Sequence, residues 1–312
     1  MRVGIVILPE QRWDQAADRW RRAEAYGFDH AWSYDHLGCQ LGDFLDGPWF
    51  DVVPTLTAAA TATTTIGLGT LVTSPNFRHP VSFARQALAL DDISHGRFRL
   101  GLGSGGGGYD RVVMGQPDLS PTQRTARFAE FVEVMDGLLT HDHFTHHSTY
   151  YHAVDARHTP GCVQQPRLPF VVAANGPRAM RIAARFGQAW LTGPIAEEIQ
   201  GDLAADLDGW WKTVSELTTR FNDILAEEGR DPNSTDRFIT LDGSPVLSMS
   251  SKNAFTEHAG RAAELGFTDL ITHWPRPSGI YQASERVLED IATDVLPHLR
   301  TPTADPVSES TK

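Results

Sequence analysis

Three short segments place residues with acid–base or anion-binding chemistry directly after apolar, strand-forming stretches. The first is Tyr34-Asp35-His36, which follows FDHAWS. Imidazole titrates near neutral pH, so a histidine beside a carboxylate can move a proton, and Asp35 and His36 are the candidate catalytic residues. The alternative is structural: Asp35 caps the loop and His36 packs beneath it.

The second segment is a glycine-rich turn in which Gly105 to Gly108 follow Ser104. Glycine leaves the backbone N–H groups of such a turn free to face an anion. A mobile surface loop would have the same composition. The turn follows the strand-forming stretch 98–102, and loops at the C-terminal ends of strands carry the chemistry of α/β folds, which favours a binding role.

The third segment is Asn175-Gly176-Pro177-Arg178, which also follows an apolar strand candidate. A proline in the first turn of a helix leaves neighbouring N–H groups exposed at the positive end of the helix dipole, an arrangement that suits a phosphate. We expect Ser104, Gly105 and this loop to hold the phosphate of a cofactor together. Arg178 either adds a charge-assisted bond or is a solvated helix residue.

The elements that must position these segments alternate along most of the chain. Apolar runs of strand length predict strands at 3–8, 28–33, 66–72, 98–102, 170–174, 188–192, 237–241 and 269–273. Helical periodicity predicts helices at 13–26, 50–62, 80–93, 122–139, 177–186, 203–228, 252–265 and 284–299. Eight strand–helix units favour a closed (β/α)8 TIM barrel with insertions over an open doubly wound sheet.

Two stretches depart from this alternation. Residues 141–168 combine aromatics, prolines and histidines without helical period, so we expect an excursion over the barrel mouth, for which a hairpin is one form. We expect it to line the mouth together with residues 38–49. Its histidines (141, 143, 146, 147, 152 and 158) lack the spacing of metal ligands, and we expect no metal site. Residues 1–300 are expected to form one domain, followed by a disordered tail at 301–312.

Charge and composition exclude several classes of partner. The formal net charge of −12 disfavours binding to nucleic acid and to anionic membranes. The sequence shows neither a secretory signal nor an apolar run of membrane-spanning length, which predicts a cytoplasmic protein. Cys39 and Cys162 are expected to be free thiols, although a disulfide between them remains open at this point.

Several motifs together resemble the luciferase-like flavin and deazaflavin oxidoreductases, over residues 1–299. They are YGFDHAW with SYDHLG, GLGTLVTSPNFRHP, LDDISHGRFRLGLGSG and VVAANGP. The segment LDDISHGRF, which matches the family pattern L-D-x-x-S-x-G-R-F, is the most specific of them.

The resemblance implies a barrel that binds reduced FMN or coenzyme F420 at the C-terminal ends of its strands. It implies a non-prolyl cis peptide between Leu71 and Val72 that supports the tricyclic ring, contact of Asp35 with that ring, and an acid–base role for His36. One residue departs from the F420-dependent sugar-phosphate dehydrogenases, because Gly106 stands where they carry a carboxylate. Asp110 could substitute only if its loop folds inward.

The sequence hypothesis is therefore an F420-dependent oxidoreductase that transfers a hydride to or from a small organic molecule. An FMNH2-dependent two-component monooxygenase is the alternative, and a non-catalytic flavin-binding barrel and a metal-dependent barrel hydrolase remain open as other classes. The resemblance also implies a homodimer and, in the FMN version, a reductase partner. The candidate cofactor-binding residues are Asp35, Leu71, Val72, Ser74, Ser104, Gly105, Tyr109, Asn175, Gly176, Arg178 and Ala179.

Overall fold

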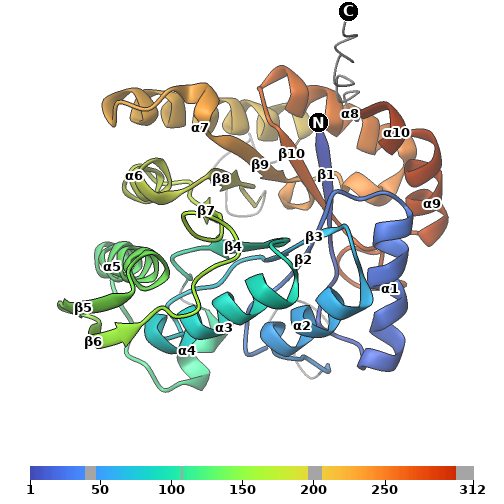
Figure 1. Cartoon of the computed structure of the whole chain (residues 1–312). Helices are drawn as coiled ribbons and strands as arrows, with labels where there is room; N and C mark the ends of the chain where they lie inside the picture. The colour runs from blue at the N-terminus through green and yellow to red at the C-terminus, as the bar shows by residue number, and fades with distance from the viewer. Residues whose placement is uncertain (39–46, 107, 196–205, 300–312) are drawn as a thin grey trace, which may run out of the picture.

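The computed structural model describes residues 1–38, 47–106, 108–195 and 206–299, in which eight parallel strands close into a barrel inside a ring of helices (Figure 1). The strands follow the order β1-β10-β9-β8-β7-β4-β3-β2 around the barrel. Their bounds are β1 Arg2–Val6, β2 His30–Ser33, β3 Gly67–Thr70, β4 Phe98–Leu102, β7 Phe170–Ala173, β8 Ala189–Thr192, β9 Asp236–Thr240 and β10 Asp269–His273. The predicted TIM barrel is confirmed.

The helices between the strands cover the outside of the barrel. The longer ones are α1 Trp13–Ala25, α2 Val52–Ala62, α3 Pro80–Ile93, α5 Pro121–Thr140, α6 Pro177–Phe186, α7 Leu207–Glu227, α8 Lys252–Glu264 and α9 Glu285–Asp294. The expected helix 284–299 is divided into α9 and the short α10 Leu296–Leu299, because Pro297 lacks the N–H that would continue the helix. A second short helix, α4 Tyr109–Val113, was not predicted.

Aromatic and charged side chains fill the part of the barrel on the side of the N-terminal ends of the strands. Trp32 is fully buried, and a Cβ atom at Gly69 would collide with its ring. Its Nε1 donates to Nδ1 of His30 at 2.6 Å, and Nε2 of His30 lies 3.0 Å from Asp269. Arg2 binds the same Asp269 through two hydrogen bonds. The barrel is therefore closed at the N-terminal ends of its strands, and any ligand must enter from their C-terminal ends.

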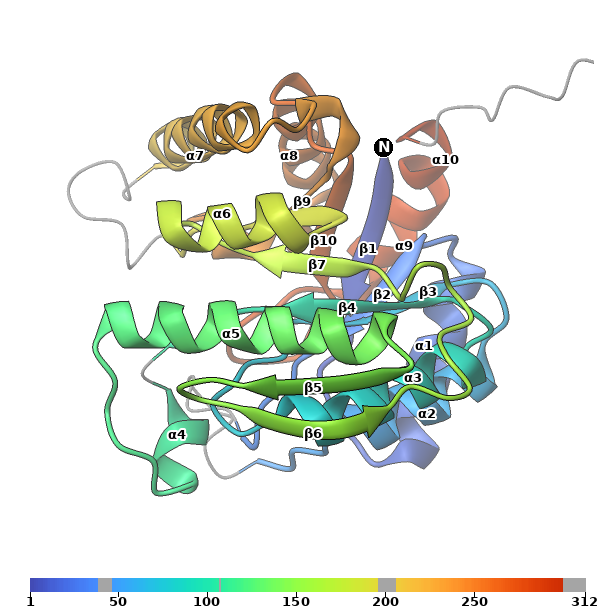
Figure 2. The same cartoon turned by 60° about the vertical axis from the view of Figure 1, so that its left-hand side comes forward.

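The excursion at 141–168 does form a hairpin, but its expected position over the barrel mouth is wrong. Strands β5 His143–His147 and β6 His152–Arg157 pair in antiparallel fashion and lie beside α5, outside the barrel (Figure 2). Glu130 of α5 accepts hydrogen bonds from the backbone of Tyr150 and Tyr151, and Gly137 of the same helix makes room for the ring of Phe144. These contacts hold the hairpin against the helix.

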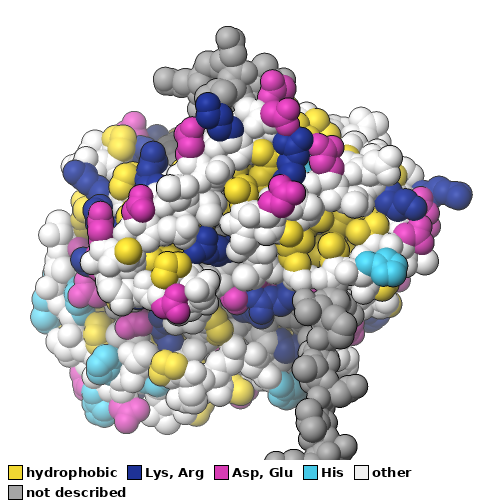
Figure 3. All heavy atoms as spheres, turned by 90° about the horizontal axis from the view of Figure 1, so that it is seen from above, with side chains coloured by type: hydrophobic (Ala, Val, Ile, Leu, Met, Phe, Trp, Pro, Cys, Tyr) yellow, Lys and Arg dark blue, Asp and Glu magenta, His cyan; other side chains and the backbone are white. Residues whose placement is uncertain are grey.

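The remaining features concern the thiols and the surface. Cys162 is a buried free thiol, whereas Cys39 and the predicted tail 301–312 lie outside the described residues. Within the described parts of the chain, no helix has the length and apolar character needed to cross a membrane, and no group of three candidate metal ligands occurs. On the face shown in Figure 3, basic and acidic side chains are interspersed, with hydrophobic patches between them.

Candidate active site

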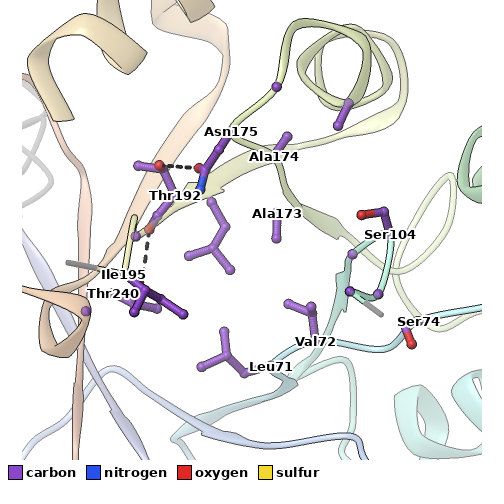
Figure 4. Close-up of a pocket in the computed structure, with 18 of the residues that line it drawn as sticks. Leu71, Val72, Ser74, Ser104, Ala173, Ala174, Asn175, Thr192, Ile195 and Thr240 are labelled. Atoms are coloured by element: carbon purple, nitrogen blue, oxygen red, sulfur yellow. Dashed lines mark hydrogen bonds between the residues drawn. The ribbon is translucent and has the colours of Figure 1, made fainter. Parts of the chain in front are cut away.

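A cavity of about 1940 Å³ opens at the C-terminal ends of the barrel strands. Loops after all of the barrel strands except β1 contribute to its lining, and part of it is shown in Figure 4. No residue of the hairpin region 141–168 lines it. The sequence-predicted residues that do line it are His36, Leu71, Val72, Ser74, Ser104, Gly105, Asn175, Gly176, Arg178 and Ala179.

The segment after β3 forms an apolar wall of this cavity. The peptide bond between Leu71 and Val72 is cis, as the resemblance implied. The side chains of both residues border the cavity (Figure 4). The next residue, Thr73, bonds through its backbone to Gly101 and Gly103 of the neighbouring β4 segment, at 2.8 and 2.9 Å. This wall is thereby fixed to the start of the glycine-rich turn.

The glycine-rich turn after β4 takes its shape from two buried side chains that the sequence did not indicate. Gly105 has a φ of +63°, which favours glycine, and a Cβ atom there would collide with the amide of Asn76. Nδ2 of Asn76 donates to the Gly106 carbonyl at 3.1 Å, and Arg127 donates to Oδ1 of Asn76 at 2.5 Å. A guanidinium and an amide thus support the turn from behind.

The N-terminus of α6 faces the cavity from the end of β7. Its N-cap is Gly176, so no side chain caps the first turn, and the N–H groups of Arg178 and Ala179 are available to a ligand. Asn175 is held in place by Thr192, whose hydroxyl donates to Oδ1 at 2.8 Å (Figure 4). Together with the glycine-rich turn, this helix start lines the part of the cavity at which the sequence predicts an anion cradle.

His36 is oriented by a carboxylate that reaches it from α4. Nδ1 of His36 lies 2.6 Å from Oδ2 of Asp110, and the other oxygen of Asp110 accepts from the backbone of Leu37 at 2.7 Å. The Asp110 side chain is 3% exposed and that of His36 is 40% exposed. Asp110 itself does not line the cavity, and it serves as the partner of His36.

Two predicted cofactor residues do not line the cavity. Asp35 is fully buried and binds Arg78 through both carboxylate oxygens, with a third bond from Thr73 at 2.7 Å. Burial raises the pKa of Asp35, and the hydrogen bonds from Arg78 and Thr73, which lower the pKa, only partly offset this effect. Because Thr73 directly follows Val72, these bonds tie Asp35 to the wall at Leu71–Val72 from the core side. Tyr109 turns toward Gly38 instead, where a Cβ atom would meet its ring.

Three cavity residues form a hydrogen-bonded chain. Tyr34 belongs to the segment singled out in the sequence but was given no role there, and Asp242 and His273 were not indicated by the sequence. Asp242 follows β9, His273 ends β10 and Tyr34 follows β2. Nδ1 of His273 lies 2.9 Å from Asp242, and its Nε2 lies 2.8 Å from the Tyr34 hydroxyl. A survey of polar residues at the end of every predicted strand would have found all three, because active residues of a barrel gather there.

Comparison with known proteins identifies the family. The model of the family "luciferase-like monooxygenase" matches residues 1–269. An F420-dependent glucose-6-phosphate dehydrogenase of Beutenbergia cavernae is 30% identical, over 89% of this chain and 91% of that protein. A 4-hydroxyprotoasukamycin monooxygenase of Streptomyces nodosus subsp. asukaensis is 27% identical, over 86% and 67% of the two chains.

Among solved structures, an F420-dependent secondary alcohol dehydrogenase in complex with an F420–acetone adduct superposes with a TM-score of 0.79. It covers 96% of this chain and 99% of its own, at 18% identity, so this likeness concerns the fold. The family match extends over most of the sequence, and the motifs from LDDISHGRF to VVAANGP lie within it. The chain belongs to the luciferase-like monooxygenase family.

Proposed function

We propose that this protein is an F420-dependent oxidoreductase that exchanges a hydride with a small organic substrate in the cavity above the barrel. The observation that carries the proposal is the placement of His36. It lines the cavity while a buried carboxylate fixes its Nδ1, and among the described residues no partner occupies its Nε2. That nitrogen is therefore available as one acid–base group of the site.

The residues of the cavity fit a flat, anionic coenzyme. Leu71, Val72 and Leu191 offer apolar surface to a tricyclic ring. The turn at Ser104–Gly105 and the uncapped start of α6 offer backbone N–H groups to a phosphate, with Arg178 beside them. When bound, F420 supplies or accepts the hydride, and the protein binds and orients it and holds the protons. The 30% identical relative is named as an F420-dependent dehydrogenase, which also supports F420 as the coenzyme.

The proposal is tested by following the absorbance of the coenzyme under anaerobic conditions. The protein is mixed with oxidised F420 and a panel of alcohols, and with reduced F420 and a panel of carbonyl compounds. We expect turnover with F420 in at least one direction, and at least 100-fold less in His36→Asn. A protein that leaves F420 unchanged with every substrate, or a variant with wild-type turnover, contradicts the proposal.

A second candidate is an FMNH2-dependent monooxygenase. It is favoured by the 27% identical relative, which is named as a monooxygenase. In this version, dioxygen is the co-substrate and a separate reductase supplies the reduced flavin. Photoreduced FMN, mixed with the protein in air and the same substrates, distinguishes the two candidates. Oxygenated products formed with FMN alone would favour the monooxygenase.

The resemblance also supports finer proposals about the molecule in the cell. We propose that two copies pair through the helices that cover the barrel, and that the enzyme works in the cytoplasm, a reducing compartment that suits the free thiol of Cys162. Light scattering of the purified protein tests the dimer. A mass of one chain at micromolar concentration would contradict it.

A further inference from the structure

The cationic side chains of the cavity are gathered on one side of the barrel. Among the described lining residues, the arginines are Arg178 and Arg181, both on α6 after β7. In the ring of strands, β7 lies directly across from β1, which is flanked by β2 and β10. The half of the cavity around β1 therefore lies opposite the anion cradle, and we call it the distal half.

Tyr34 and His273 line this distal half, and neither lysine nor arginine occurs among its described lining residues. A phosphorylated substrate would need a cation or a set of backbone N–H groups there, because a desolvated phosphate is otherwise very costly. The distal half is suited to an uncharged molecule.

The hydrogen bonds of the distal half fix the tautomer of His273. Oδ2 of Asp242 accepts from the backbone N and from Nδ1 of His273, both at 2.9 Å. Oδ1 accepts from the backbone N and hydroxyl of Ser248, at 2.8 and 2.7 Å. Burial alone would raise the pKa of Asp242, but the bonds from His273 and Ser248 outweigh it and lower the pKa. An ionised Asp242 holds the proton of His273 on Nδ1 and leaves Nε2 as an acceptor.

Tyr34 connects this pair to the cavity. Its hydroxyl lies 2.8 Å from Nε2 of His273 and 2.9 Å from the hydroxyl of Tyr281, whose ring stacks on His273 at 3.6 Å. With Nε2 accepting, the Tyr34 hydroxyl donates to His273, and its oxygen accepts from Tyr281. A substrate hydroxyl that enters the cavity can take the place of Tyr281 as this donor.

We propose that Tyr34, backed by His273 and Asp242, is the catalytic proton carrier for the oxygen of an uncharged alcohol or its carbonyl product. In oxidation, the alcohol proton moves to the Tyr34 oxygen while the Tyr34 proton moves to Nε2 of His273. The electron pair of the broken O–H bond forms the C=O bond as the hydride leaves the carbon for the coenzyme. Asp242 stabilises the imidazolium, which loses its proton to water, and reduction of the carbonyl is the reverse.

This inference rests on the proposed function and completes its proton balance. Oxidation of an alcohol by F420 releases a proton from the substrate and requires one for the coenzyme. Two separate aspartate–histidine pairs reach the cavity, Asp110–His36 and Asp242–His273. The second pair is linked to Tyr34 and serves the substrate, which leaves His36 for the coenzyme.

The kinetic test compares Tyr34→Phe with Tyr150→Phe, a matched control in the turn of the hairpin, which does not line the cavity. F420 is reduced by uncharged secondary alcohols such as 2-propanol and cyclohexanol, and by glucose 6-phosphate. We expect kcat with the alcohols to fall at least 100-fold in Tyr34→Phe, with KM and the Kd of F420 within about threefold. Tyr150→Phe should match the wild type. His273→Gln, as a second variant, should also lose kcat.

A readout that needs no coenzyme is the ¹⁵N spectrum of the histidines, with the His273 signal assigned by its loss in His273→Gln. We expect the neutral tautomer protonated at Nδ1, and a shift of the Nε2 signal in Tyr34→Phe. Three results would overturn the inference: an Nε2-protonated neutral His273, wild-type kcat in Tyr34→Phe, or faster turnover of glucose 6-phosphate than of any uncharged alcohol. Failure of F420 to bind, in contrast, would contradict the proposed function itself.

Discussion

Nδ1 of His36 lies 2.6 Å from Oδ2 of Asp110, although the two residues are 74 positions apart in the sequence. Asp110 belongs to the short helix α4, which brings its buried carboxylate to the loop after β2. The bond fixes the orientation of the imidazole ring and directs its other nitrogen away from the carboxylate. The orientation of His36 in the cavity therefore depends on the carboxylate of Asp110.

Asp110→Asn is expected to lower kcat/KM for F420-dependent turnover by about 10- to 100-fold. The amide keeps the size of the side chain but removes the charge that fixes the proton on Nδ1 of His36. Steady-state kinetics with the best substrate of the panel measures the loss. Asp118→Asn, a change to an exposed carboxylate outside the cavity, is the control and should leave turnover unchanged. Equal rates for Asp110→Asn and the wild type would refute the role of this pair.

Arg78→Met is expected to destabilise the fold by about 3–5 kcal/mol at pH 7, because it leaves the buried Asp35 carboxylate without its cation. The pKa of Asp35 in the folded protein is already raised by burial, and loss of Arg78 raises it further. The folded variant then binds more protons than the unfolded chain between the two pKa values, so its stability falls as pH rises through that interval. Urea unfolding from pH 4 to pH 7 measures this slope.

If Arg78→Met loses the same free energy of unfolding at pH 4 and at pH 7, the loss does not come from the uncompensated charge of Asp35. Asp35→Asn is the matched comparison, since it removes the charge and keeps the shape. Its stability should vary less with pH than that of Arg78→Met.

Gly105→Ala is expected to raise the Kd of F420 at least tenfold. Alanine is strained at a φ of +63°, and its Cβ atom would collide with the Asn76 amide that supports the turn. Calorimetric titration measures the affinity. Gly108→Ala is the control, because a Cβ atom there meets no atom within 4 Å. Equal losses of affinity in both variants would indicate that the turn does not act through the geometry of Gly105.

Glu24→Gln is expected to lower the free energy of unfolding by about 1 kcal/mol at neutral pH, since the side chain is partly exposed. Burial would raise the pKa of Glu24, but backbone N–H groups of Thr65, Ile66 and Thr64 bind it and lower the pKa to about 2. The carboxylate therefore adds stability above its unfolded pKa of 4.5, and this is lost as pH falls toward 2.

Acid unfolding of Glu24→Gln beside the wild type checks this expectation. The difference in the free energy of unfolding between the two proteins should shrink from pH 5 toward pH 2. The exposed control Glu264→Gln should have the stability of the wild type over this range. A difference that stays constant over this range would contradict the assigned cause.

The fold could be predicted from the sequence because the strand–helix alternation is local and repeated. Each predicted strand overlaps an observed one, and α3 and α6 have their predicted bounds, fixed by Pro80 and Pro177 in their first turns. The position of the hairpin could not be predicted in this way. It depends on contacts with Glu130 and Gly137 of α5, and periodicity carries no information about such contacts.

The candidate site was predictable where a single loop supplies several groups, as in the glycine-rich turn and the start of α6. It was not predictable where residues from distant loops meet. Asp35 was assigned to the cavity because the resemblance implies its contact with the ring, whereas Arg78 and Thr73 hold it in the core. Tyr34 was given no role, and Asp242 and His273 were missed, for the same reason: their contacts with one another form only when the barrel closes.

The binding of F420 is tested most directly by calorimetric titration of the purified protein with oxidised and reduced F420 and with oxidised and reduced FMN. We expect a saturable site for F420 with one coenzyme per chain, and an affinity for FMN at least about tenfold weaker, or about 1.4 kcal/mol. Tighter binding of FMN, or binding of neither coenzyme, would contradict this expectation.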